Sequence, residues 1–467
     1  MSHVTRRTFL VGTSAVAGAV ALGGCSGDEG AAAATGAPTS PPGTPTTAAA
    51  TTTAPVSAPV PATSLPPFDP TDWASVRAQF PLAAGPNARF DAFVVASHPH
   101  PVAEAIGRHR AALDADGELY VERQAFEGGD QAVLDAAARY LGANSSEIAL
   151  TQSTTMGLGL LYAGLRVRPD QRVLVTEHDF YSTHQAWQLR SGREGIAVDR
   201  VALYTDPATA DTSTIVTNLV AAVTPATRVV AITWVHSGTG VKLPVGEIAA
   251  ALAELNAGRA PADRALLCVD GIHGFGVEDA TAADLGCDFL VSGTHKWLFG
   301  PRGTGIVWGA ADAWEHVEPA VPAFEAESFS EWINRSPTGP TTAARFAPGG
   351  THAYEHRWSV VEAFEFHQQV GKGRIAAYTH EQATRLKDGL AELPGVRLIT
   401  PLAAELSSGI VCAEVPGVSP FEAVGRLAER GIVAGSTPYR ESYLRFGPSI
   451  VTTPDEVDAL VAELSSW

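Results

Sequence analysis

Two side chains with complementary chemistry lie near each other in the middle of the chain. Asp270 ends a short apolar run at residues 265–269, and Lys296 follows the polar segment SGTH at residues 292–295. A glycine turn, GPRGTG at residues 300–305, comes soon after the lysine. A lysine shielded from water is a nucleophilic amine that forms Schiff bases with aldehydes. A carboxylate nearby holds a pyridine nitrogen protonated, so the pair predicts pyridoxal phosphate as the cofactor.

The strands and helices predicted around this pair indicate an α/β fold. Apolar strand patterns alternate with helical patterns throughout residues 148–309, which is typical of a mostly parallel sheet with helices on both faces. Sheets of this kind place ligands at the carboxyl ends of their strands, where Asp270 and Lys296 stand. We expect strands at residues 148–150, 173–175, 228–235, 265–269, 288–291 and 305–308.

A hydroxyl-rich segment opens the helix predicted after the first strand. It contains Ser153, Thr154 and Thr155. The free N–H groups of a helix amino terminus, hydroxyl donors and the positive end of the helix dipole together favour an anion. The segment is therefore a candidate site for the cofactor phosphate, although the same pattern alone also fits a helix cap.

The order of these motifs resembles the aminotransferase class V group of fold-type I pyridoxal-phosphate enzymes, which includes cysteine desulfurases, kynureninases, isopenicillin N epimerase-like proteins and C–S lyases. The group's pattern is D-x-x-H or D-x-x-Q, then S-x-H-K, then G-P-x-G-x-G. One extra residue, SGTHK in place of SGHK, departs from it. The resemblance implies a large cofactor-binding domain and a smaller C-terminal α/β domain. The residues that carry it are Asp270, His273, Ser292, His295, Lys296 and the turn at 300–305.

The same resemblance implies roles for single residues. Lys296 is the catalytic lysine that bonds to the cofactor and moves protons at the substrate, and Asp270 is the partner of the pyridine nitrogen. Phe180 stacks on the ring, with His178 as the alternative. Arg445 binds the substrate carboxylate as a bidentate pair.

The remaining implied contacts concern the cofactor and a second subunit. Ser237 occupies a position where the group usually has Asn, so this chain departs from the group at that contact. Gly350 and Thr351 reach the phosphate of a neighbouring subunit, which implies a homodimer with shared sites. The full implied cofactor-binding set is Ser153, Thr154, Thr155, His178, Phe180, Ser237, Asp270, His273, Ser292, His295, Lys296, Gly350 and Thr351.

The amino-terminal part predicts targeting rather than a fold. Residues 1–25 combine the twin-arginine motif TRRTFL, an apolar run and a lipobox-like end at Cys25, and residues 26–66 form an Ala/Thr/Pro-rich stretch that predicts a disordered tether. We expect export by the twin-arginine route. The product is then a lipoprotein on the outer side of the cytoplasmic membrane, or a periplasmic or secreted protein. The folded chain divides into a large domain at 67–325 and a dimer-contact segment with the small domain at 326–467.

Composition limits the partners. The 467 residues carry a formal net charge of −18, with 50 acidic and 32 basic residues. Binding to a phosphate backbone needs clustered cations, so nucleic acid is not expected as a partner. The expected partner is a small amino-acid substrate, with membrane contact only through lipid at Cys25.

Cysteine positions discriminate among activities of the group. Cys412 lies in the apolar run 409–413, which predicts a strand with a packed thiol. A desulfurase needs a cysteine nucleophile on a loop, so this activity is disfavoured, while transamination, epimerisation and C–S lyase chemistry stay open. A disulfide between Cys268 and Cys287 also stays open.

Two functions from other classes are alternatives. An exported solute-binding lipoprotein without catalysis fits the leader but needs no lysine–aspartate pair. A metal-dependent hydrolase would use His98, His100, His178 and His184, but proline after the first two favours a rigid loop, and no metal is expected. For the later part of the chain, we expect a loop at residues 324–345 and helical structure at 358–386.

Overall fold

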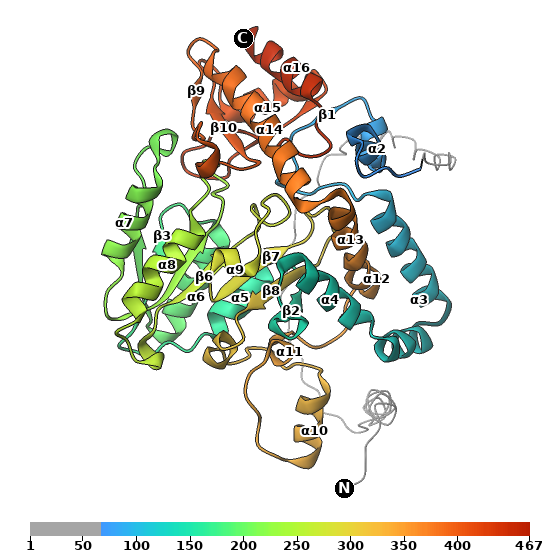
Figure 1. Cartoon of the computed structure of the whole chain (residues 1–467), viewed down its shortest axis with the longest axis vertical. Helices are drawn as coiled ribbons and strands as arrows, with labels where there is room; N and C mark the ends of the chain where they lie inside the picture. The colour runs from blue at the N-terminus through green and yellow to red at the C-terminus, as the bar shows by residue number, and fades with distance from the viewer. Residues whose placement is uncertain (1–66) are drawn as a thin grey trace, which may run out of the picture. The chain divides into compact units, whose positions relative to one another are not determined.

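The computed structural model describes residues 67–467, whose central element is a seven-stranded sheet (Figure 1). Its order is β2-β8-β7-β6-β5-β3-β4, and β8 alone runs antiparallel to its neighbours in this sheet. The predicted mostly parallel α/β sheet is therefore confirmed. Its strands are β2 (Ile148–Thr151), β3 (Arg172–Thr176), β4 (Ala197–Val201), β5 (Thr227–Thr233), β6 (Leu266–Asp270), β7 (Phe289–Gly293) and β8 (Gly305–Gly309).

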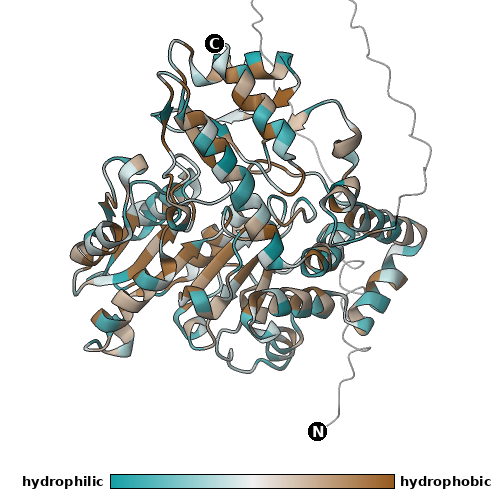
Figure 2. Ribbon diagram, turned by 45° about the horizontal axis from the view of Figure 1, so that its top comes forward, coloured by the Kyte–Doolittle hydropathy of each residue, from teal (hydrophilic) through white to brown (hydrophobic). Residues whose placement is uncertain are grey.

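Helices pack on both faces of the large sheet: α4 (Gly129–Leu141), α5 (Thr154–Gly164), α6 (Tyr181–Glu194), α7 (Thr212–Ala222) and α8 (Val245–Asn256). In β6, Leu266 and Cys268 pack into one core with α5 and α6, whereas Leu267 and Val269 pack into another with α4, α7 and α8. Successive side chains of a strand point to opposite faces, and both faces are covered here. The central strands accordingly form brown ribbon between more polar helices (Figure 2).

A second, four-stranded antiparallel sheet forms from the C-terminal part of the chain, in the order β12-β13-β10-β9. Helices α14, α15 and α16 share its apolar core. A separate short parallel pair joins β1 to β11, so the first strand contacts the C-terminal part of the chain. These elements are β1 (Ala88–Arg89), β9 (Arg397–Leu398), β10 (Val411–Glu414), β11 (Ile432–Val433), β12 (Gly435–Ser436), β13 (Leu444–Phe446), α14 (Lys372–Ala391), α15 (Pro420–Glu429) and α16 (Pro454–Ser465).

The expected loop at residues 324–345 is wrong in part, because it contains α10 (Ala326–Asn334) and the beginning of α11 (Ala343–Phe346). The Glu325 carboxylate caps α10 by accepting hydrogen bonds from two backbone N–H groups of its first turn. Arg345 then binds Glu331 through both terminal nitrogens, at 2.8 and 2.7 Å. This ion pair joins residues fourteen positions apart, which local periodicity does not reveal.

The helical structure expected at 358–386 is present but divided. Helix α13 (Val360–Val370) ends before Gly371, whose φ of 95° lies in the left-handed region that favours glycine, and α14 begins at the next residue. The other α-helices are α2 (Trp73–Ala78), α3 (His100–Glu127), α9 (Ala282–Leu285) and α12 (Tyr354–Trp358).

The predicted twin-arginine signal, the lipid site at Cys25 and the tether at 26–66 lie outside the described residues. Across residues 67–467, no helix is both long and apolar enough to cross a membrane.

Candidate active site

The predicted site residues follow the carboxyl ends of neighbouring strands. His178 follows β3, Ser237 follows β5, Asp270 ends β6 and Lys296 follows β7. These four strands are parallel and adjacent in the order β7-β6-β5-β3. The sheet therefore brings residues from four separate segments to one edge, as expected for a ligand site in an open α/β sheet.

Lys296 is the amine of this site. Its Nζ lies 3.4 Å from Nε2 of His273. Burial lowers the pKa of Lys296 to about 8, with the Asp270 carboxylate opposing the change and the Arg445 cation adding to it. A larger share of the lysine is therefore neutral near physiological pH, which is the form that attacks a carbonyl.

Asp270 supplies a buried carboxyl group, with only 1% of its surface exposed. Its Oδ1 accepts a hydrogen bond from the Ile272 backbone N–H at 3.1 Å. Burial raises the pKa of Asp270 to about 6, opposed by this hydrogen bond and by the Lys296 cation. An anion in such a dry environment is suited to a cationic partner such as a protonated ring nitrogen.

The start of α5 packs closely against the end of β7. Ser153 caps the helix by accepting from the Met156 N–H, and Thr154 Oγ1 accepts from the Gly293 N–H at 2.7 Å. A methyl group on Gly293 would lie 2.9 Å from Nδ1 of His295 and 3.2 Å from Thr154 Oγ1. Glycine allows this close approach, and the positive end of the α5 dipole favours an anion there.

Two other residues of the predicted cofactor-binding set have different surroundings. Thr155 is exposed on the first turn of α5, next to the buried Thr154. Ser292 is fully buried in β7, and its hydroxyl donates to the carbonyl oxygen of Gly293 at 2.9 Å. Their contacts with a cofactor remain predictions.

Both candidates for ring stacking lie at the end of β3, in different settings. The ring of His178 stacks on Tyr204 at 3.9 Å with an interplanar angle of 8°, and burial lowers its pKa to about 4. The ring of Phe180 meets Tyr439 edge-on at 6.2 Å. His178 is therefore a neutral, already stacked ring, whereas Phe180 contacts the side chain of a later loop.

Arg445 brings a cation from the small sheet to the large one. Its guanidinium lies 4.0 Å above the Phe93 ring, and Nη1 donates to the Ser237 carbonyl oxygen at 3.2 Å. The side chain is 8% exposed, and its buried Nε has no hydrogen-bond partner among the described residues. A buried donor without an acceptor is unfavourable, so this group fits an incoming carboxylate.

Sequence reasoning missed Tyr439, on the segment between β12 and β13. Its hydroxyl lies 2.6 Å from Oγ of Ser237, and its ring lies against Gly238, where a methyl group would be only 2.9 Å away. Burial raises the pKa of Tyr439 to about 12, so it stays a neutral phenol. No local motif connects positions 202 residues apart, so only the structure identifies this contact.

The structure also locates the predicted dimer-contact residues and the histidines considered as metal ligands. Gly350, with φ of 107°, and the exposed Thr351 follow α11, and their role toward a second subunit stays a prediction. Within residues 67–467, no group of three His, Cys, Asp or Glu side chains is arranged to hold a metal ion. His98 instead lies 3.1 Å from an Arg302 nitrogen.

The three cysteines of the described part are free and buried. Cys268 and Cys287 pack into cores on opposite faces of the large sheet, so a disulfide between them is not formed. Cys412 lies in β10 with no exposed surface, as predicted, and burial raises its thiol pKa to about 12.

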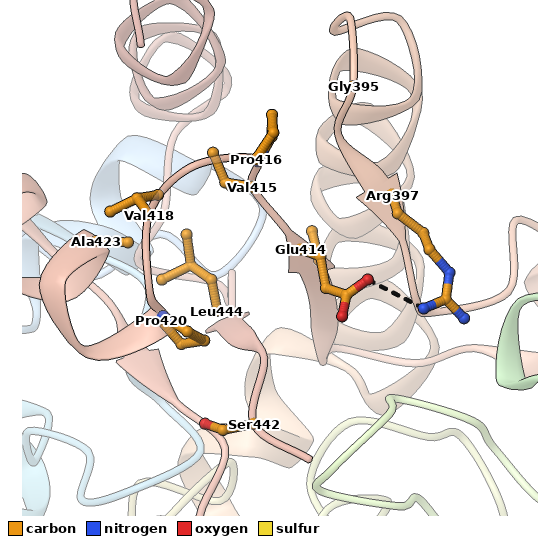
Figure 3. A pocket seen from close by; sticks show the side chains of 11 residues that line it. Gly395, Arg397, Glu414, Val415, Pro416, Val418, Pro420, Ala423, Ser442 and Leu444 are labelled. Atoms are coloured by element: carbon orange, nitrogen blue, oxygen red, sulfur yellow. Dashed lines mark hydrogen bonds and ion pairs between the residues drawn. The ribbon is translucent and has the colours of Figure 1, made fainter.

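A separate cavity of about 340 Å³ lies in the small sheet (Figure 3). An ion pair between Arg397 and Glu414, 3.0 Å apart, stands on one side, opposite the apolar side chains of Val418 and Leu444. None of the predicted site residues lines this cavity, so it is distinct from the site at the strand ends.

Comparisons with known proteins show the family and the fold of the chain. Residues 98–460 match the family described as aminotransferase class-V. The chain is 27% identical to isopenicillin N epimerase of Streptomyces clavuligerus, over 71% of this chain and 83% of that protein. It is 26% identical to a cysteine desulfurase of Pectobacterium atrosepticum, over 83% and 96% of the two chains. Among solved structures, a mutant of C-DES with glycine covalently linked to its PLP cofactor has the same fold, with a TM-score of 0.75, 21% identity, and coverage of 84% of this chain and 99% of that one.

Proposed function

The chain belongs to the aminotransferase class-V family, and from that premise we propose that it is a pyridoxal-phosphate-dependent enzyme that acts on a small amino acid. The observation that carries the proposal is the convergence of Lys296, Asp270 and Arg445 at one edge of the sheet. Burial of an ionisable group is unfavourable unless a partner or a ligand compensates its charge. Buried groups of this kind cluster at functional sites.

The residues present fit pyridoxal phosphate. The cluster of Thr154, Gly293 and His295 at the start of α5 suits the phosphate, because a helix amino terminus, a hydroxyl and an imidazole meet there. Asp270 suits the pyridine nitrogen, and Lys296 suits the aldehyde carbon. When bound, the cofactor supplies an electron sink for negative charge at the substrate α-carbon.

The protein's own groups then bind the substrate and carry the proton. Arg445 has an uncommitted Nε and binds the α-carboxylate, while the Ser237 carbonyl oxygen holds its guanidinium in place. Lys296 takes a proton from the α-carbon and returns it, since a pKa of about 8 suits a base that works near neutral pH. The neutral Tyr439 hydroxyl, paired with Ser237, is a polar contact for the substrate.

Three reactions of this kind remain in the proposal: transamination, epimerisation and C–S lyase chemistry. The relative named isopenicillin N epimerase supports chemistry at the α-carbon. A desulfurase that carries a persulfide on cysteine is disfavoured, because every thiol in residues 67–467 is buried.

A covalent trap tests the proposal. The purified protein is loaded with pyridoxal phosphate, reduced with borohydride and digested, and the adduct is expected on the Lys296 peptide. Lys387 is an internal control: burial lowers its pKa to about 8 as well, but its Nζ is already hydrogen-bonded to the Leu402 carbonyl oxygen and the Ser407 hydroxyl. An adduct on Lys387 and none on Lys296 would contradict the assignment.

We further propose that the enzyme is a homodimer that works outside the cytoplasmic membrane. The family resemblance at Gly350 and Thr351 supports the dimer, and the twin-arginine motif with Cys25 supports export. Sedimentation of the purified protein tests the first statement. Cell fractionation of the wild type and of Cys25→Ala tests the second, with release from the membrane fraction expected for the variant.

A further inference from the structure

We infer that the indole of Trp297 is a positioning group: it fixes His273 in the tautomer that carries its proton on Nε2, and thereby favours the neutral amine of Lys296. This inference deepens the proposed function and rests on Lys296 as the reactive amine. It concerns two buried side chains whose contacts with each other are independent of any bound molecule.

The argument begins with hydrogen-bond donors. Nε1 of Trp297 donates to Nδ1 of His273 at 3.3 Å. An indole nitrogen is a donor only, so Nδ1 of His273 must act as the acceptor. His273 is 4% exposed, and burial holds its pKa well below the ordinary value, so the ring is neutral. A neutral imidazole with an acceptor at Nδ1 carries its single proton on Nε2.

That proton faces the lysine. Nε2 of His273 lies 3.4 Å from Nζ of Lys296. A neutral amine has a lone pair and accepts from this N–H, whereas an ammonium group has donors only and would oppose it. The tautomer set by Trp297 therefore favours the neutral lysine over the charged one.

The tryptophan cannot easily turn away from His273. Its side chain is 2% exposed, and two glycines leave room for the ring. A methyl group on Gly409 would lie 2.8 Å from its Cη2 atom, and one on Gly447 would lie 3.2 Å from the same atom. Both glycines border strands of the small sheet, so packing there holds the indole in the orientation that fixes the imidazole.

Other ionisable groups also act on Lys296, and the test must separate their effects from the effect of Trp297. Asp270 favours the ammonium form, while Arg445 opposes it. The ring of His295, adjacent in sequence, is neutral because burial lowers its pKa to about 4. Loss of the Trp297 N–H leaves these groups unchanged but frees Nδ1 of His273. The imidazole can then move its proton to Nδ1 and offer Nε2 as an acceptor to the ammonium group, which raises the pKa of Lys296.

The first experiment measures the lysine without the cofactor. Apoprotein is labelled with trace acetic anhydride across a pH series, and labelling of Lys296 is quantified by peptide mapping. In Trp297→Phe, which keeps an aromatic ring and loses the N–H, we expect the profile to move upward by about one pH unit, or about tenfold less labelling at a fixed pH below the transition. Trp187→Phe is the matched control, because Trp187 is equally buried but stacks on Tyr162 in a core on the other face of the large sheet.

An unchanged profile in a folded Trp297→Phe protein overturns the inference, as does an equal shift in Trp187→Phe. If Trp297→Phe does not fold, nitrogen-15 NMR of histidine-labelled wild-type apoprotein decides. The His273 signal, identified by its loss in His273→Gln, should show a protonated Nε2 and an unprotonated Nδ1, and the opposite pattern refutes the assignment. Failure of the proposed function is recognised separately, as absence of a borohydride-trapped adduct on Lys296 while the acetylation profile of Lys296 still shifts in Trp297→Phe.

Discussion

Replacement of Asp270 by asparagine should stabilise the apoprotein at neutral pH while it removes most of the activity. The carboxyl group is 1% exposed, and burial raises its pKa from 3.8 to about 6 despite the nearby lysine. The folded state therefore disfavours the charged form that the unfolded chain adopts freely. Asparagine removes this charge and keeps an Oδ1 that can still accept from the Ile272 N–H.

The magnitude and its pH dependence follow from the two pKa values. A rise of the Asp270 pKa from 3.8 to about 6 corresponds to about 3 kcal/mol. This value is the upper limit of the increase in the free energy of unfolding that we expect for Asp270→Asn above pH 6. Because the folded pKa is the higher one, the penalty on the wild type is complete above about 6 and absent below 3.8. The gain should therefore shrink as the pH falls through this window.

The assay is urea unfolding of apoprotein at pH 7.5 and at pH 4.5, with wild type and Asp270→Asn compared at each pH. Turnover of the loaded proteins is measured in parallel, and it should fall steeply, because a neutral amide cannot keep the pyridine nitrogen protonated. If Asp270→Asn is less stable than the wild type at pH 7.5, then the carboxylate is a stabilising partner and the argument is refuted. Near-normal turnover would remove Asp270 from its proposed role.

Three further predictions concern other parts of the site. Arg445→Ala should raise KM for amino acids by about 10- to 100-fold and lower kcat less, because most of its binding is present in the ground state, whereas equal effects on both would indicate a transition-state role. Gly293→Ala should abolish retention of pyridoxal phosphate in gel filtration, since the added methyl group would lie 2.9 Å from Nδ1 of His295; the control Gly192→Ala, with open space around it, should retain the cofactor. Cys412→Ser should keep activity and lose about 1 kcal/mol of stability. A persulfide trapped on Cys412 after incubation with cysteine would instead place the enzyme among the desulfurases.

Some of the fold was predictable because it depends on local periodicity. The strands β2, β3, β5, β6, β7 and β8 each contain an apolar run bounded by turn residues, and each was located within a few residues. β4 was not identified, because its residues AVDRV are only partly buried at the sheet edge and give no apolar run. The expectation of a loop at 324–345 overlooks Phe329, Trp332 and Ile333, which stand at helical spacing within α10. What the sequence does not show is that Trp332 and Ile333 stay exposed and that Glu331 pairs with the distant Arg345.

The sequence by itself determined which residue types stand at the strand ends, since a motif such as Asp270 with Lys296 depends only on chain order. It could not determine which side chains from distant segments meet. The contact of Arg445 with Ser237 and the hydroxyl pair of Ser237 with Tyr439 follow from how the two sheets pack. The placement of Cys268 and Cys287 in separate cores follows from the packing of helices on the two faces of the large sheet. Backbone periodicity is a local property, whereas these partners are chosen by shape and burial across the whole fold.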